Sequence, residues 1–245
     1  MNDGLPFNPL QLPPHGASGS QAINHIFDIA GLLAATLGLG DRQKALLRHS
    51  LEAAYENLQV PLRDWVDPDI TLAPSLGDII ERARAQDADL AAGLTDRLGL
   101  LHGKRLLPSS ANARMRLGHL LKMRAILSFH NLPNDDQLKR ALAELVLIQL
   151  QGHMLRGDQP RALRRLLVFD EAWRAADSKR LIQIAREGRA FGVGVVAGSQ
   201  FADDLSNGLT GNLASKLTFI TRMPGSAASS FKGCLEPLRE QRQLS

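Results

Sequence analysis

Apolar residues recur at helical spacing in the first half of the chain. Between residues 21 and 101 they fall on single faces, most clearly over residues 23–30 and 43–58. Further helices are expected at residues 76–85, with Ser75 or the residue before it as a cap and Asp78 in the first turn, and at residues 87–98. This part of the chain is therefore expected to form a small helical subdomain.

From residue 124 onward, short apolar runs alternate with helical stretches. This pattern predicts βα units and an α/β fold with a mostly parallel sheet. Strands are expected at residues 125–129, 166–169, 193–197 and 217–220, with crossover helices at residues 137–156 and 178–189. Each strand ends in polar or charged residues. Since open α/β sheets bind ligands beyond the carboxyl ends of their strands, we expect the functional site there.

The first 20 residues are rich in residues that break regular structure: Pro6, Pro9, Pro13, Pro14, Gly4, Gly16 and Gly19. They predict an extended connector laid over a surface. The expected organisation is a connector over residues 1–20, the helical subdomain over 21–122 and the sheet-bearing part over 123–245.

Composition narrows the functional classes only slightly. With 44% hydrophobic and 22% charged residues, the chain has the composition of a globular protein. No apolar run approaches the roughly 20 residues that cross a bilayer, so we expect no membrane insertion. A single cysteine, Cys234, and a polar, proline-rich start fit a cytoplasmic protein. The net charge of +4 permits a polyanionic partner without indicating one.

Two adjacent carboxylates, Asp170 and Glu171, follow the apolar run at residues 166–169. In nucleotide hydrolases, an aspartate at a strand end holds Mg²⁺ and a following glutamate polarises the attacking water. A solvated acidic pair at the end of an ordinary strand is the simpler interpretation. The context favours phosphate hydrolysis, because a helix and a second strand that leads to Gln200 follow.

Gln200 ends a strand with glycines at 192, 194 and 198, where its amide could orient a water or sense a terminal phosphate. Arg186, Arg189 and Arg222 are candidates for stabilising phosphoryl charge, within one subunit or across an interface. Arg186 and Arg189 lie three residues apart on an expected helix, so they should share a face. A solvated helix end explains these two equally well.

The chain has no Gly-x-x-x-x-Gly-Lys-Ser/Thr phosphate-binding loop. The Gly103-Lys104-Arg105 run lacks the upstream glycine and has an arginine where the Mg²⁺-binding hydroxyl belongs. The histidines lack metal-ligand spacing, and no serine lies in a Gly-x-Ser-x-Gly motif. The sequence therefore contains half of a hydrolytic site.

Three stretches carry a family resemblance, namely residues 166–173, 184–194 with 198–200, and 219–223. Together they resemble the C-terminal half of the HerA/FtsK superfamily of P-loop ATPases, including conjugation and type IV secretion ATPases. The resemblance is specific over residues 163–223. Farther upstream it is weaker, although residues 7–10 are similar to the Asn-Pro turn after the family's second strand.

The resemblance implies an ATP- and Mg²⁺-dependent hexameric ring that translocates DNA, or an export motor in the secretion branch. Asp170 would be the Mg²⁺-associated aspartate, Glu171 the catalytic glutamate and Gln200 the sensor. Arg189 and Arg222 would face the terminal phosphate or the next subunit, with Arg186 as a further nucleotide-binding candidate. A nuclease partner is also expected in some of these systems.

The family's first two strands and its phosphate-binding loop have no counterpart in the chain. We therefore expect either a fragment of a longer protein or a partner polypeptide that supplies the other half. A non-catalytic DNA-binding or assembly module with the same fold is the alternative. The joint presence of Asp170, Glu171 and Gln200 favours the ATPase.

Overall fold

The computed structural model describes residues 5–12, 22–62, 73–103, 106–108, 115–129, 132, 135–155, 159–160, 162–171, 177–200 and 204–217. The chain divides into two compact units, residues 1–159 and 160–245. This division lies later than the one expected after residue 122. Helix α6 (Asp136–Met154) lies in the stretch expected to belong to the sheet-bearing part, but it packs against helix α1 and belongs to the first unit.

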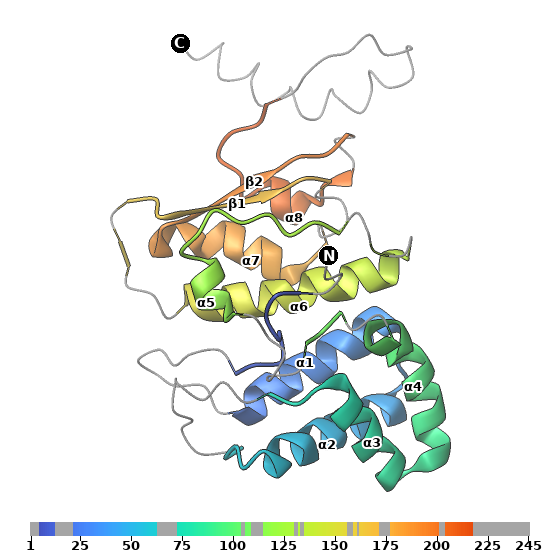
Figure 1. Ribbon diagram of the computed structural model, residues 1–245. Helices are drawn as coiled ribbons and strands as arrows, with labels where there is room; N and C mark the ends of the chain where they lie inside the picture. The colour runs from blue at the N-terminus through green and yellow to red at the C-terminus, as the bar shows by residue number, and fades with distance from the viewer. Residues whose placement is uncertain are drawn as a thin grey trace, which may run out of the picture. The chain divides into compact units, whose positions relative to one another are not determined.

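The first unit is helical in its described residues (Figure 1). Its helices are α1 (Ala22–Leu37), α2 (Asp41–Asn57), α3 (Leu76–Gln86), α4 (Ala88–Gly103), the short α5 (Leu117–Leu120) and α6. The helices expected between residues 21 and 101 are therefore present. Ser75 caps α3 as predicted: its Oγ accepts a hydrogen bond from the Asp78 amide at 3.2 Å, and Asp78 Oδ2 accepts from the Ser75 amide at 2.7 Å. Among the described helices, none is long and apolar enough to cross a membrane.

The breaker-rich segment at residues 5–12 is buried within the first unit, whereas the sequence suggested a connector on the surface. Phe7, Asn8 and Leu10 are at most 1% exposed. Two surrounding side chains make three hydrogen bonds to its backbone: the Gln149 amide donates to the carbonyls of Pro9 and Gln11, and the Tyr55 hydroxyl donates to that of Leu10. These bonds allow a segment without regular structure to lie inside a helical core, because buried carbonyls need partners.

Asn8 connects this buried segment to the loop before α3. Its Nδ2 donates to the Pro74 carbonyl at 3.1 Å, and its Oδ1 accepts from the Leu10 amide at 2.9 Å. Tyr55, on α2, is buried as well, and burial raises the pKa of its hydroxyl. The phenol therefore stays protonated and remains a donor.

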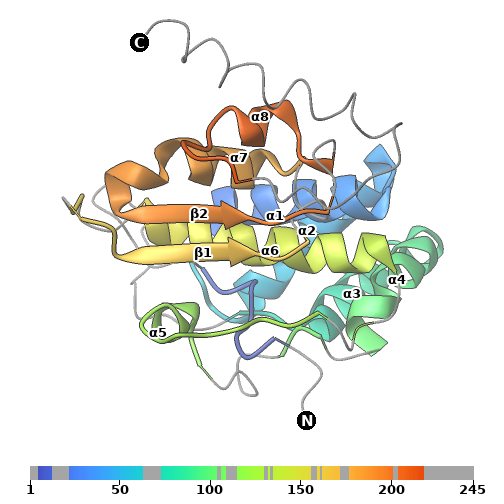
Figure 2. The ribbon, with the colours of Figure 1, turned by 90° about the horizontal axis from the view of Figure 1, so that it is seen from above.

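The second unit contains two parallel strands, β1 (Arg165–Phe169) and β2 (Val193–Ala197), which lie side by side (Figure 2). Helix α7 (Lys179–Glu187) and the 3₁₀ turn η2 (Gly188–Phe191) connect them, and the short helix α8 (Asn207–Thr210) follows. The Ser178 hydroxyl caps α7 by accepting from the Leu181 amide at 3.2 Å. The predicted strand–helix–strand unit is confirmed at this place.

The other two expected strands are not part of this sheet as described. Residues 125–129 form no strand, and Ile126 is 93% exposed. A strand needs a neighbouring strand for its ladder of backbone hydrogen bonds, and the sheet formed by the described residues pairs β1 with β2 alone. Of the run at residues 217–220, Leu217 alone lies within the described residues.

Gly192 fixes how the two strands begin. Its φ is +68°, and a Cβ there would lie 2.6 Å from Pro160 Cγ and 2.7 Å from the Ala162 carbonyl oxygen. The Gly192 carbonyl accepts from the amides of Arg164 and Arg165 at 2.8 and 3.0 Å. The close backbone packing expected from the glycines of this strand is therefore present at Gly192.

Asn8→Ala should lower the free energy of unfolding by about 2–4 kcal/mol, because it leaves the Pro74 carbonyl and the Leu10 amide buried without partners. Urea unfolding monitored by circular dichroism measures this loss. The matched control is Asn57→Ala at the exposed end of α2, which should change stability by less than about 0.5 kcal/mol. Equal effects of the two substitutions would contradict the structural role of Asn8.

Candidate functional site

The carboxyl ends of β1 and β2 meet at one edge of the sheet (Figure 2). Phe169 pairs with Ala197, so Asp170 and Gly198 follow at neighbouring positions. The Gly198 amide donates to the Phe169 carbonyl at 2.9 Å, and a Cβ on Gly198 would lie 4.0 Å from Asp170 Oδ1. The second strand therefore leaves the sheet close to the aspartate carboxylate.

Glu171 has a left-handed backbone, with a φ of +53°. Its amide donates to Asp170 Oδ1 at 3.1 Å, so the turn after β1 uses the aspartate side chain as an acceptor. Both carboxylate residues are exposed. Non-glycine residues adopt this conformation at a cost of roughly 1 kcal/mol, and such strain occurs often at functional sites.

A hydrogen bond between two side chains holds the turn after β2. Ser199 Oγ donates to Asp204 Oδ2 at 2.7 Å, which closes the loop that carries Gln200. Gln200 itself is exposed and directly follows the Ser199 anchor. Asp170, Glu171 and Gln200 are therefore placed at one edge of the sheet. In the sequence, this bond is signalled only by the hydroxyl of Ser199, directly before Gln200, and by an acidic residue five positions after that serine.

The two candidate arginines within the described residues lie near the opposite edge of the sheet. Arg186 is near the end of α7, and Arg189 is in η2, just before β2 begins. A five-residue strand spans about 16 Å, so this distance separates η2 from the edge that carries Asp170. Since α7 ends at Glu187, the two arginines also do not share one continuous α-helical face. Arg222 lies outside the described residues.

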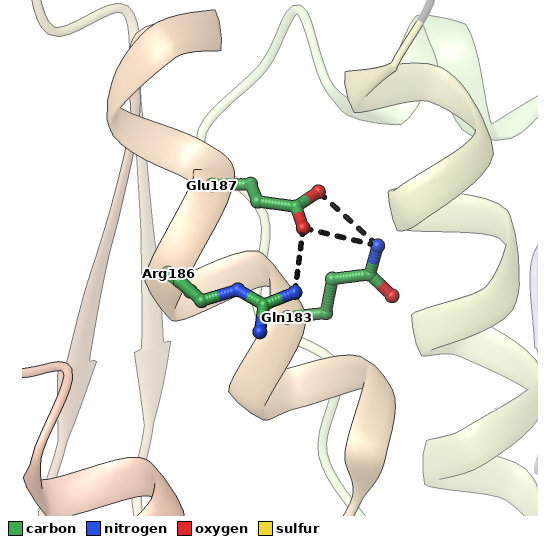
Figure 3. A network of polar contacts seen from close by, with 3 residues as sticks. All are labelled: Gln183, Arg186 and Glu187. Atoms are coloured by element: carbon green, nitrogen blue, oxygen red, sulfur yellow. Dashed lines mark hydrogen bonds and ion pairs between the residues drawn. The ribbon is translucent and has the colours of Figure 1, made fainter.

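Arg186 takes part in a surface network at the end of α7 (Figure 3). Its guanidinium contacts Glu187 Oε1 at 2.9 Å, and the Gln183 amide donates to both Glu187 carboxylate oxygens at 3.1 and 3.3 Å. The hydrogen bond from Arg186, followed by those from Gln183, lowers the pKa of the Glu187 carboxyl. In this arrangement Arg186 is engaged with its own helix.

The chemistry of the edge fits Mg²⁺, which keeps most of its water ligands and takes one or two protein carboxylates. Asp170 supplies one exposed carboxylate there. Within the described residues, no group of three His, Cys, Asp or Glu side chains is placed to form a metal cage.

The chain resembles a solved structure described as VirB4 of Thermoanaerobacter pseudethanolicus, with a TM-score of 0.62 and 21% sequence identity. The two proteins share a fold. The match covers 86% of this chain and 59% of the VirB4 chain, so the present chain spans well under two thirds of that neighbour's length. The α/β class is confirmed, and the fold is that of part of a RecA-like domain. No protein-family model matches the chain, and no curated protein matches it.

Glu171→Gly should unfold at higher urea concentration than Glu171→Ala, by about 1 kcal/mol in free energy, because glycine adopts the left-handed backbone without steric strain. Both variants lack the carboxylate, so the difference between their free energies of unfolding reports on the backbone conformation alone. If Ala and Gly at 171 are equally stable, the turn after β1 is not strained.

Proposed function

We propose that the chain is the carboxyl-terminal part of an ATP-hydrolysing motor domain of the HerA/FtsK superfamily. The observation that carries the proposal is the meeting of Asp170, Glu171 and Gln200 at the carboxyl edge of the parallel pair β1–β2. The shared fold with VirB4 supports it, since the same kind of domain is then expected.

In the proposed site, Asp170 would hold Mg²⁺, which would supply positive charge next to the phosphates of ATP. Glu171 accepts a proton from the attacking water, and the Gln200 amide orients that water or senses the terminal phosphate. Phosphate-binding loop residues must come from outside the 245 residues, because no such loop occurs in the sequence. The 245-residue chain alone is therefore expected to show no ATP turnover.

The arginines fit a role between subunits. Arg189 lies a strand length from Asp170 in the same chain, so it reaches a terminal phosphate more readily when that phosphate is bound by a neighbour. This geometry favours a ring with repeated head-to-tail interfaces, and we propose a hexamer. Arg222 is the second candidate for the same role, and Arg186 is a further nucleotide-binding candidate.

Two substrates are compatible with such a motor. The likeness to VirB4 favours a secretion or conjugation-type export ATPase. The motif stretch at residues 163–223 favours HerA-like translocation of DNA. A motor of this kind would act in the cytoplasm, with a nuclease as a partner. DNA-stimulated turnover supports DNA translocation, and turnover that does not respond to DNA supports export.

In the protein expressed from its complete reading frame, Glu171→Gln should lower kcat for ATP hydrolysis by about 10²–10⁴-fold, because the water then lacks its proton acceptor. A phosphate-release assay measures the rate. Glu56→Gln, which removes an exposed carboxylate on α2, is the matched control and should keep full activity. Unchanged turnover in Glu171→Gln would refute the assigned role and favour a non-catalytic module.

Arg189→Ala subunits should regain ATPase activity when they are mixed with Glu171→Gln subunits. In an equal mixture, about a quarter of head-to-tail interfaces combine an intact glutamate with an intact arginine. The same phosphate-release assay on mixed and unmixed samples measures the recovery, with Arg222→Ala treated in parallel. If neither arginine variant recovers, the trans role is wrong for both.

A further inference from the structure

The two faces of the β1–β2 sheet differ in how strongly they are exposed to solvent. The register pairs Leu166 with Gly194 and Val168 with Val196, so these residues share one face. We call Leu163, Leu166, Val168 and Val196 the open face, because their side chains are 65%, 54%, 66% and 46% exposed. Leu163 and Leu166 both border Gly194: a Cβ there would lie 3.1 and 3.2 Å from their Cδ1 atoms.

The opposite face is covered by its own unit. Val193 is 7% exposed and lies against the turn at Gly188, where a Cβ would be 3.3 Å from Val193 Cβ. Helix α7 lies on that side of the two strands (Figure 1). Helix α8 packs against α7, since a Cβ on Gly208 would lie 3.0 Å from Ile182 Cδ1. Neither helix therefore covers the open face.

A strand with one face in water normally alternates apolar and polar residues, whereas a strand buried on both faces is apolar throughout. Strand β1 is apolar on both faces after Arg165. Burying a leucine or valine side chain gains about 1.5–3 kcal/mol, and two strands alone make a marginal sheet. The open face is therefore expected to be buried against another element.

Helices are what cover the faces of parallel sheets. Gly194 lets the side chains of Leu163 and Leu166 close over it, so the apolar surface of the open face is continuous from β1 to β2. The VirB4 chain extends well beyond the region that this chain matches, which indicates that a related protein has further segments to place. A helix from polypeptide outside these 245 residues is therefore the best-fitting occupant.

We propose that an amphipathic helix from the part of the same protein that carries the phosphate-binding loop docks on the open face. The inference rests on the proposed function, because that function requires the missing loop. The docked helix presents apolar residues at helical spacing to Leu163, Leu166, Val168 and Val196. Its docking holds the outside segment next to the strands that end in Asp170 and Gln200.

Thiol accessibility tests this docking. Cys234 is replaced by serine, and a single cysteine is introduced as Val168→Cys, with Val196→Cys as a second reporter if the first fails to fold. The thiol reaction rate with a small maleimide is measured in the 245-residue chain and in the protein from the complete reading frame. Lys179→Cys, at the exposed start of α7, is the matched control.

We expect the thiol at position 168 to react at least about tenfold more slowly in the longer protein, with no change at position 179. Equal rates at 168 in both proteins would overturn the proposal. So would slow reaction in the 245-residue chain alone, whether it depends on concentration, as for a second copy, or disappears when residues 218–245 are deleted. A reading frame that begins at Met1 overturns it as well.

ATP turnover of the longer protein separates this inference from the proposed function. Protection at position 168 without ATP hydrolysis upholds docking and refutes the ATPase. Hydrolysis that is lost in Glu171→Gln but is accompanied by no protection upholds the ATPase and refutes docking at this face.

Discussion

The parallel pairing of β1 with β2 is the constraint on which the candidate site depends. Because Phe169 lies beside Ala197, the residues that follow each strand leave the sheet at the same edge. A shift of one residue in this register would turn the apolar side chains of β2 to the other face. Asp170 and the loop of Gln200 lie together for this reason, and no direct bond between them is required.

Within the first unit, burial and hydrogen bonding act together on the segment at residues 5–12. Hydrophobic burial of Phe7 and Leu10 draws the segment inward, but its carbonyls would oppose burial without partners. Gln149 and Tyr55, from helices far apart in the sequence, supply donors to consecutive carbonyls. The stability of this unit therefore depends on a few polar side chains inside an otherwise apolar core.

The sequence predicted the features that depend on neighbouring residues in the chain. The helical spacing of apolar residues predicted α1 to α4, and Ser75 with Asp78 predicted a helix cap. The short apolar runs predicted β1 and β2 with α7 between them. Residues 125–129 have the composition of a strand, but pairing depends on a partner that composition does not reveal. The burial of residues 5–12 was missed because proline and glycine report backbone conformation, while burial depends on distant donors such as Gln149. The separation of Arg189 from Asp170 depends on the direction of β2, which places one residue before the strand and the other at its far end. The hydrogen bond between Ser199 and Asp204 depends on how the loop between them folds, which the sequence does not show.

The left-handed backbone at Glu171 limits which side chains this position accommodates without conformational cost. Glycine, asparagine and aspartate are the residues that such a conformation accommodates best. A glutamate at this position therefore carries a backbone cost that these three residues would largely avoid.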